Sequence, residues 1–334
     1  MIRKLAVLLV LLVLAAGAAG WWLFNRLSTP HRAFQGEEVF VDLPAGTSVS
    51  AMAARLAEAG VVSDALTFRL AARLSGQERR LQAGEYRFVE AATPTQIVDR
   101  LASGDVFVTP ITFREGLTIR EMATVFETSE RGTAEAFLVA ARRAELIRDL
   151  DRRADDLEGY LFPSTYTLSR DTTADELVEL MVRSFEQAFD PALRAEAEAA
   201  GMTVREVVTL ASVVERETAK PEERPMVAGV FLNRLRIGMP LQTDPTVIYA
   251  LMRSGRWNGN ITRRDLQMEH PYNTYRNRGL PPGPIAAPGR ASIEAVLRPA
   301  DVPYLYFVSR NDGSHVFAST LAEHNRNVRE WQLR

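Results

Sequence analysis

Two glutamates, Glu215 and Glu217, end an apolar segment over residues 203–218 and are the best candidates for acid–base chemistry. The segment is expected to be a helix, because apolar residues recur at the spacing of a buried stripe: Val207, Leu210, Ala211 and Val214. At about 100° per residue the two carboxylates lie about 200° apart, so one can face a site while the other faces elsewhere. A carboxylic acid held against apolar side chains has a raised pKa and can donate a proton near neutral pH. The helical pattern favours Glu217 only slightly, and two solvated charges at a helix end are the alternative.

Several other kinds of reactive centre are excluded by the sequence. It contains no cysteine, which rules out thiolate nucleophiles, disulfides and thiolate metal sites. The four histidines form no pair at metal-ligand spacing, and no glycine-rich phosphate-binding motif follows a predicted strand. The net charge of −2 gives no electrostatic case for nucleic acid. We therefore expect no metal, no cofactor and no nucleic-acid partner.

The N-terminus has the pattern of a membrane anchor. Residues 5–24 carry no charge and, at about 1.5 Å per residue, are long enough to cross a hydrocarbon core of roughly 30 Å. Trp21 and Trp22 lie near the end of this segment, where interfacial aromatics are common. A cleaved signal peptide is the alternative, although its apolar core is typically only about 7–15 residues. We expect a retained transmembrane helix after a short terminus at residues 1–4, followed by a polar tether at residues 25–36.

A strand–turn–helix pattern occurs twice, at an offset of 70 residues. Residues 43–53 match residues 113–123, so that Gly46 corresponds to Gly116 and Met52 to Met122. A Ser or Thr before each helix can cap its free N–H groups. The pattern is similar to a LysM module, which binds N-acetyl sugars, although turn, cap and amphipathic helix also arise together without that function. We expect a LysM-like α/β module at residues 37–110 and a second such unit near 111–127, at the start of a domain over residues 111–334.

The elements after Glu217 supply polar side chains for a binding site. A helix is expected to begin at Arg224-Pro225 and to end at Gly238, and Asp244-Pro245 has the pattern of an N-cap followed by Pro at the first helical position. Residues 268–288 contain five prolines and no periodicity, and so long a loop is usually functional or disordered. Beyond the loop, residues 304–308 and 315–317 are expected to pair as a hairpin. The fold class is therefore mixed α+β.

Several longer segments of the chain resemble the signature of a known family. The segments Ala211–Thr218, Val230–Tyr249, Tyr272–Tyr275, Gly279–Ile285 and Glu323–Asn327 resemble the signature of the YceG-like family of endolytic murein transglycosylases. The segment Leu157–Leu168 is similar to the segment that opens the catalytic domain of that family. The resemblance extends over nearly the whole chain, which makes it more specific than any short motif.

The resemblance implies a function and a location. It implies that the second glutamate of the signature, Glu217, is the catalytic acid, and that the substrate is peptidoglycan. It also implies an inner-membrane protein with a cytoplasmic N-terminus and a periplasmic catalytic domain, next to penicillin-binding synthases that polymerise glycan. The candidate substrate-binding residues are Gln242, Thr243, Asp244, Tyr249, Asn273, Thr274 and Tyr275.

The chemistry of such an enzyme needs only one carboxyl group. Ordinary glycosidases place two carboxylates across the scissile bond. A lytic transglycosylase instead uses the C6 hydroxyl of the sugar as an intramolecular nucleophile, whose effective molarity replaces the second carboxylate. Two alternatives stay open. A water-using muramidase would need a second acid, for which Glu215, Asp244 and Glu269 are available, and a glycan-binding scaffold would leave Glu217 on the surface.

Overall fold

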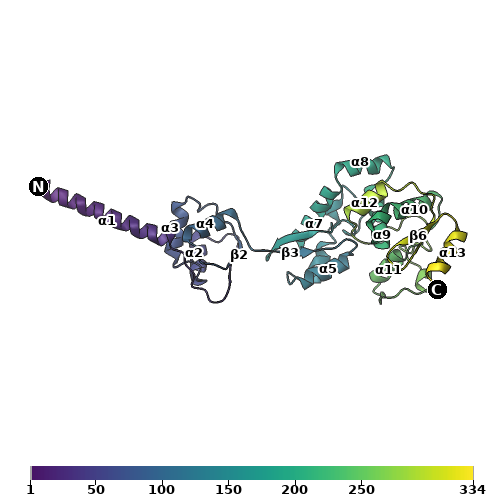
Figure 1. The fold of residues 1–334 in the computed structure, drawn as a ribbon, viewed down its shortest axis with the longest axis horizontal. Coiled ribbons are helices and arrows are strands. Elements are labelled where there is room, and N and C mark those ends of the chain that lie inside the picture. The colour runs from purple at the N-terminus through teal and green to yellow at the C-terminus, as the bar shows by residue number, and fades with distance from the viewer. Residues whose placement is uncertain (1, 334) are drawn as a thin grey trace. The chain divides into compact units, whose positions relative to one another are not determined.

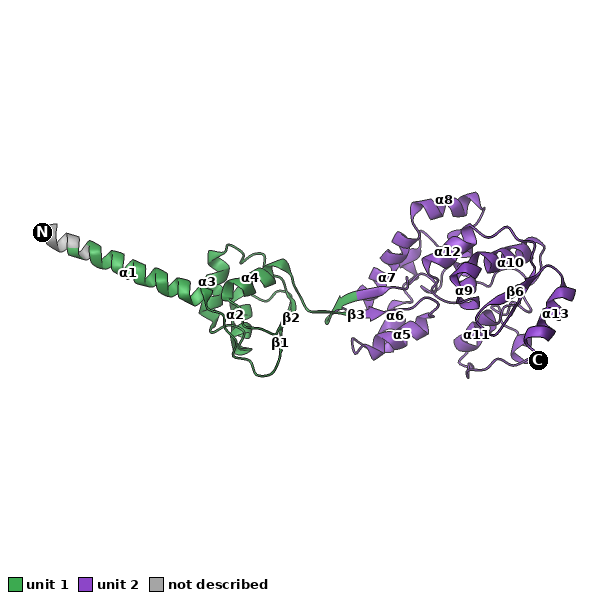
Figure 2. Cartoon of the chain, in the orientation of Figure 1, with its two compact units in different colours: residues 1–110, 167–171 green, residues 111–166, 172–334 purple. Residues whose placement is uncertain are grey.

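The computed structural model describes residues 2–333, which form two compact units. The first consists of residues 1–110 with 167–171, and the second of residues 111–166 with 172–334 (Figure 2). Figure 1 gives the order of the elements along the chain. The helices and strands of the first unit are α1 (Ile2–Ser28), β1 (Val39–Leu43), α2 (Val49–Glu58), α3 (Ala65–Leu74), β2 (Gly84–Phe88) and α4 (Pro94–Ser103).

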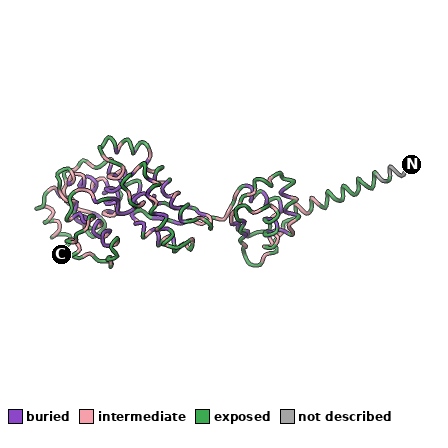
Figure 3. Tube along the Cα trace, turned by 180° about the vertical axis from the view of Figure 1, so that it is seen from behind, coloured by how far each residue is buried: buried purple, intermediate pink, exposed green. Residues whose placement is uncertain are grey.

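Helix α1 is long and apolar enough to cross a membrane. The part that meets this criterion is Leu9–Ser28, which is 20 residues long, and none of it is buried inside the protein (Figure 3). Length and composition suit a membrane anchor and also a signal sequence, so they leave both alternatives in place. The expected helix over residues 5–24 is therefore present, and it continues for another turn.

The segment after the apolar helix is not a free tether, and that expectation was wrong. Arg26 donates to Thr67 Oγ1 at 2.7 Å and forms an ion pair with Asp64, both at the start of α3. Further along, His31 forms a β-bridge with Ala92, and Ala33 N donates to the Gly60 carbonyl oxygen at 2.8 Å. Polar composition and Pro30 predicted a linker, but backbone and side-chain bonds to residues far along the chain fix it to the first unit.

The core of the first unit lies between a two-stranded sheet and three helices. Strands β1 and β2 pair antiparallel, with Val39 opposite Phe88 and Leu43 opposite Gly84. Their inward side chains pack on α2, α3 and α4 in one cluster of buried residues. Among its largest fully buried side chains are Tyr86, Phe68, Leu43, Leu56 and Ile97.

The repeat found in the sequence is also a repeat in backbone geometry. Gly46 and Gly116 both adopt the left-handed conformation, with φ of 80° and 79°. Ser48 caps α2 and Thr118 caps α5 (Ile119–Thr128), each by accepting a backbone N–H of the first turn. A local sequence pattern has therefore folded twice into the same turn and cap. The glycan-binding role of the repeat stays a prediction.

The second unit contains most of the helices. Strand β3 (Val108–Thr112) pairs with β4 (Thr165–Ser169), and each of these two strands has residues in both units. Strand β5 (Tyr306–Ser309) pairs antiparallel with β6 (His315–Ala318), as the predicted hairpin requires. The remaining helices are α5 (Ile119–Thr128), α6 (Ala134–Ala140), η1 (Ala144–Ile147), α7 (Ala174–Ala188), α8 (Pro191–Ala199), α9 (Val204–Glu217), η2 (Pro221–Glu223), α10 (Arg224–Arg236), α11 (Asp244–Arg253), η3 (Asp265–Gln267), α12 (Arg290–Leu297) and α13 (Leu321–Trp331).

Helix α9 is the central helix of this unit. Thr203 caps it, and Glu206 completes a capping box. We expected burial along one stripe, but all eight residues from Val207 to Val214 are buried. The reason is that α9 packs against α8, α10, α11 and α12, so every side of its middle faces another helix. The C-terminal end of α9, which carries both glutamates, is thereby held in place.

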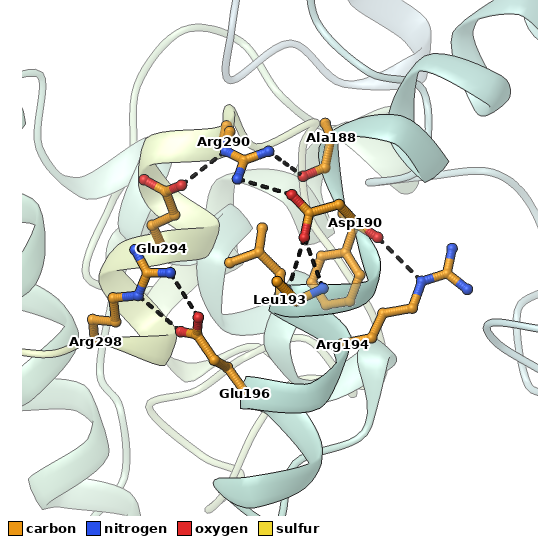
Figure 4. Close-up of polar contacts among 10 residues, drawn as sticks. Ala188, Asp190, Leu193, Arg194, Glu196, Arg290, Glu294 and Arg298 are labelled. Carbon is orange, nitrogen blue, oxygen red and sulfur yellow. Dashed lines mark hydrogen bonds and ion pairs between the residues drawn. The ribbon is translucent and has the colours of Figure 1, made fainter.

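Ion pairs connect the two outer helices α8 and α12. Arg298 makes two contacts with the Glu196 carboxylate, at 2.8 and 2.6 Å, and Arg290 contacts Asp190 at 3.1 Å (Figure 4). Asp190 also caps α8 through the N–H of Leu193. Because α12 packs on α9, these bonds help to hold the layer that covers the central helix.

Candidate active site

The carboxylate of Glu217 contacts a buried hydroxyl. Thr243 Oγ1 donates to Glu217 Oε2 at 2.6 Å, and Thr243 is only 2% exposed. Burial raises the pKa of Glu217 above its usual value, although the Thr243 hydrogen bond acts in the opposite direction. No ion pair to Glu217 is found among residues 2–333. A carboxyl group in this setting holds a proton to higher pH than an exposed glutamate does.

Glu215 has a different environment and a structural role. Its two carboxylate oxygens accept from Arg224 Nη2 at 2.8 Å and from Gly289 N at 3.0 Å. Arg224 also reaches Glu115 at 3.3 Å, so its guanidinium links the end of α9 to the turn before α5. The helical geometry expected from the sequence is therefore confirmed, since the two glutamates have separate partners. Glu215 is committed to an ion pair, whereas Glu217 is not.

Charged and polar groups from several elements act on Glu217. The negative charge of Asp244 raises its pKa, whereas electrostatic interactions with His315 and Arg234 lower it. Arg234 is buried and donates to the carbonyl oxygens of Leu305 and Leu241, the first at 2.6 Å. Its guanidinium also lies over the ring of Tyr306, 5.5 Å from the centroid. A fixed cation near Glu217 stabilises the carboxylate that forms when the acid gives up its proton.

The sequence predicted Asp244 as the N-cap of α11, and that prediction was wrong. Thr243 is the N-cap residue, and Asp244 is already the first helical residue, with Pro245 after it. The Asp244 carboxylate accepts instead from the Tyr275 hydroxyl at 2.6 Å. Burial, and then this hydrogen bond, raise the pKa of Tyr275, which therefore stays a donor. Asp244 and Tyr275 thus form a polar pair beside Glu217.

Two of the candidate substrate contacts are used inside the protein. Asn273 is fully buried, and its amide donates to the carbonyl oxygens of Leu266 and Met268. Thr274 is 1% exposed, and its hydroxyl accepts from Thr243 N at 3.1 Å. These side chains are not available to a sugar in this structure. Their bonds hold the start of the loop over residues 268–288 and help to place Thr243, which donates to Glu217.

The other candidates are placed differently. Gln242 is exposed and adopts a φ of 49°, which is unusual for a residue other than glycine and is frequent at functional sites. Tyr249 is buried, donates to Glu158, and lines a pocket with it whose lining does not include Glu217. Gln242 therefore fits a substrate contact, whereas Tyr249 belongs to a separate pocket.

Short sequence motifs do not show which charged residues from distant parts of the chain lie near Glu217. His315, on β6, lies 2.7 Å from Glu223 through its Nδ1 atom, and its backbone N–H donates to the same carboxylate at 2.9 Å. The Thr218 hydroxyl, next to Glu217, donates to Glu223 as well. Neither His315 nor Arg234 was among the site residues predicted from the sequence. The signals were indirect: the hairpin prediction placed His315 at the start of a strand, and Arg234 lies within the signature segment Val230–Tyr249.

Of the three acids that could serve a hydrolase as its second carboxylate, two are poorly placed. Glu215 is ion-paired, and the side chain of Glu269 is 90% exposed and forms a long ion pair with Arg276, at 3.6 Å. Asp244 is the acid that acts on Glu217 directly. Among the described residues there is also no group of three metal-ligating side chains that could hold a metal ion. The chemistry of the site therefore centres on one carboxyl group with Asp244 beside it.

Comparisons with known proteins give the same assignment as the signature motifs. The model of the YceG-like family matches residues 41–330. The chain is 33% identical over 304 residues to the endolytic murein transglycosylase of Bacillus subtilis strain 168, covering 86% of this chain and 83% of that one. It is 30% identical to the endolytic murein transglycosylase of Streptococcus pneumoniae strain D39, covering 96% of this chain and 63% of the length of that relative.

A solved structure extends the similarity to the fold. The crystal structure of a YceG-like protein from Listeria monocytogenes superposes with a TM-score of 0.60 at 33% identity, covering 87% of this chain and 98% of that one. Both the family match and the relatives cover most of the chain, and the family match includes the helix that ends in Glu217. The protein therefore belongs to the YceG-like family.

Proposed function

We propose that the protein is an endolytic peptidoglycan lytic transglycosylase in which Glu217 is the single general acid and base. The observation that carries this proposal is the contrast between the two glutamates of α9. Glu217 is held in a buried setting that raises its pKa and has no ion pair with any described residue, while Glu215 is bonded to Arg224. The names of the relatives supply the substrate class, which is murein.

The proposed reaction needs no water. Protonated Glu217 gives its proton to the glycosidic oxygen between N-acetylmuramic acid and N-acetylglucosamine as the bond from C1 to that oxygen breaks. The C6 hydroxyl oxygen of the muramic acid then bonds to C1, and its proton passes to the Glu217 carboxylate. The product carries a 1,6-anhydro end, and the enzyme regains its starting protonation state. Arg234 and His315 would stabilise the carboxylate between the two proton transfers.

The proposal is tested with sacculi and the full-length protein. Wild type should release anhydro ends, and Glu217→Gln should lose about 10²–10⁴-fold in rate, because its amide cannot transfer the proton. The matched control is Glu217→Asp, which keeps an acid but shortens the side chain. Reducing ends, which are one water heavier by mass, would show a muramidase, with Asp244 as its second carboxylate. Full activity in Glu217→Gln would exclude Glu217 as the acid, and no cleavage by the wild-type protein would leave only the scaffold role.

The N-terminal helix gives the proposed location. We infer that α1 is a single-pass anchor in the inner membrane, with the N-terminus cytoplasmic and the catalytic unit periplasmic, close to the penicillin-binding synthases that make new strands. The length of Leu9–Ser28 and the exposed Trp21 and Trp22 support this. A mature protein that starts near Trp21 and is released without detergent would contradict it.

The first unit is proposed to bind glycan as a LysM-like module. Its order of strand, two helices and strand, with β1 and β2 paired, supports this together with the Gly46 turn. Deleting residues 37–103 should weaken retention on purified peptidoglycan while some cleavage of soluble strands remains. Equal retention of the deleted and intact proteins would assign the module another role.

A further inference from the structure

The second unit contains a pocket that the proposed reaction does not use. It has a volume of about 240 Å³ and lies between the start of α5, the end of α6, the segment before Gly159 and the second half of α11. This is smaller than the roughly 300–1,000 Å³ of pockets for drug-sized ligands. It suits one small group rather than a sugar ring with its substituents. Its apolar lining includes Ile119, Leu138, Ala141 and Met252.

The acid in this pocket adds no negative charge at neutral pH. Glu158 is buried, and it accepts from Ile119 N and from the Tyr249 hydroxyl, both at 3.1 Å. Burial and, after it, the nearby Asp156 carboxylate raise the pKa of Glu158 to about 8, against the opposing effects of its two hydrogen bonds and of Arg253. The carboxyl group is therefore neutral at pH 7 and can itself donate a hydrogen bond.

Three arginines surround the pocket with little compensation. Arg253 lies over the rings of Tyr249 and Tyr272, and its contact with Asp156 is long, at 3.8 Å. Arg120 and Arg142 are exposed, and neither makes an ion pair with any residue between 2 and 333. With Asp156 as the only charged acid in the lining, the pocket has an excess of positive charge. Guanidinium groups bind planar carboxylates through paired hydrogen bonds.

We propose that this pocket binds the C-terminal carboxylate of a short peptide that ends in a small apolar residue. The arginines would hold the carboxylate, and the apolar lining would contact the terminal side chain. Peptidoglycan strands carry such peptides as stems, so the source of the ligand rests on the proposed function. The pocket would then read the stem, while Glu217 acts on the glycan.

The test measures binding to the full-length protein in detergent by isothermal titration calorimetry. The probe is the tripeptide diacetyl-L-lysyl-D-alanyl-D-alanine, and its C-terminal amide and inorganic phosphate are the comparison ligands. Wild type should bind the acid at least tenfold more tightly than the amide. Equal binding of acid and amide, or no binding of either, would overturn the proposal. Binding of phosphate without the tripeptide would make the pocket a phosphate site instead.

Matched variants locate the binding. The double variant Arg120→Gln, Arg142→Gln should weaken tripeptide binding at least tenfold, whereas Arg148→Gln, Arg152→Gln changes two exposed arginines outside the pocket and should not. Equal effects of the two pairs would mean that only net charge matters. The lytic reaction provides an independent readout. Anhydro products without tripeptide binding would overturn this inference alone, whereas tripeptide binding without anhydro products would overturn the reaction alone.

Discussion

Glu158 should make the stability of the protein fall as the pH rises. Its side chain is ordinary in the unfolded chain, with a pKa of 4.5, but burial raises the pKa to about 8 in the folded state. Between these values the folded protein keeps a proton that the unfolded chain has lost, so folding stability decreases with pH. The full stability is present below about pH 4.5 and is lost as the pH passes about 8.

The size of this effect follows from the two pKa values. The interval from 4.5 to about 8, at about 1.36 kcal/mol for each pH unit, amounts to roughly 5 kcal/mol. Glu158→Gln stays neutral at every pH and keeps an oxygen that accepts from Ile119 N. Relative to wild type, this variant should therefore gain roughly 5 kcal/mol between pH 4.5 and pH 8.5.

Scanning calorimetry of the full-length protein in detergent measures this gain. In a unit of roughly 150–250 residues each kcal/mol moves the melting temperature by about 2–4 °C, so the variant should gain about 10–20 °C on wild type over this range. Glu198→Gln, at an exposed position on α8, is the matched control and should show no such trend. A constant difference between wild type and Glu158→Gln would mean that the carboxyl group is already ionised when folded, and the reasoning would fail.

Three further changes test other parts of the structure. Thr243→Val removes a hydrogen bond that lowers the pKa of Glu217, so the pH at which activity declines on the alkaline side should increase; an unchanged pH–rate profile would exclude Glu217 as the titrating acid. Gly159→Ala adds a Cβ only 2.4 Å from Pro284 and should lower the free energy of unfolding by about 3 kcal/mol or more. Its control, Gly238→Ala, has the same left-handed backbone but open space around it, and should lose about 1–2 kcal/mol. Equal losses in urea unfolding would refute the steric argument. Arg26→Gln removes the bonds to Asp64 and Thr67 and should speed tryptic cleavage after Arg32 several-fold, and cleavage at the wild-type rate would show that the remaining backbone bonds suffice.

Local patterns predicted the elements of the site well. The separation of Glu215 from Glu217 follows from helical geometry alone, and the turn at Gly116 follows from the matching residues around Gly46. The paired strands β5 and β6 were also predicted, because alternation and turn residues are local signals. These features depend on neighbours within a few residues along the chain.

Tertiary partners could not be predicted in the same way. Arg234 and His315 act on Glu217 from α10 and β6, and no local pattern in either element indicates that charge. For a related reason, the sequence did not show that the Asn273 amide bonds to the backbone. Its amide suits a sugar hydroxyl as well as a backbone carbonyl, and the fold of the loop decides which one it meets. Likewise, the helix wheel showed one stripe of α9 but not the four helices that pack around it.

The bonds of Arg26 fix the rotation of α1 about its own axis relative to the rest of the first unit. A flexible tether would let the unit turn freely about the helix axis, but Arg26 is bonded to the first turn of α3. One residue inserted between Trp22 and Arg26 would turn the unit by about 100° and move it by about 1.5 Å along the axis. Four inserted residues would return it to within about 40° of its starting direction. If α1 lies in a bilayer as proposed, the number of residues between Trp22 and Arg26 determines which face of the rest of the first unit turns toward the lipid.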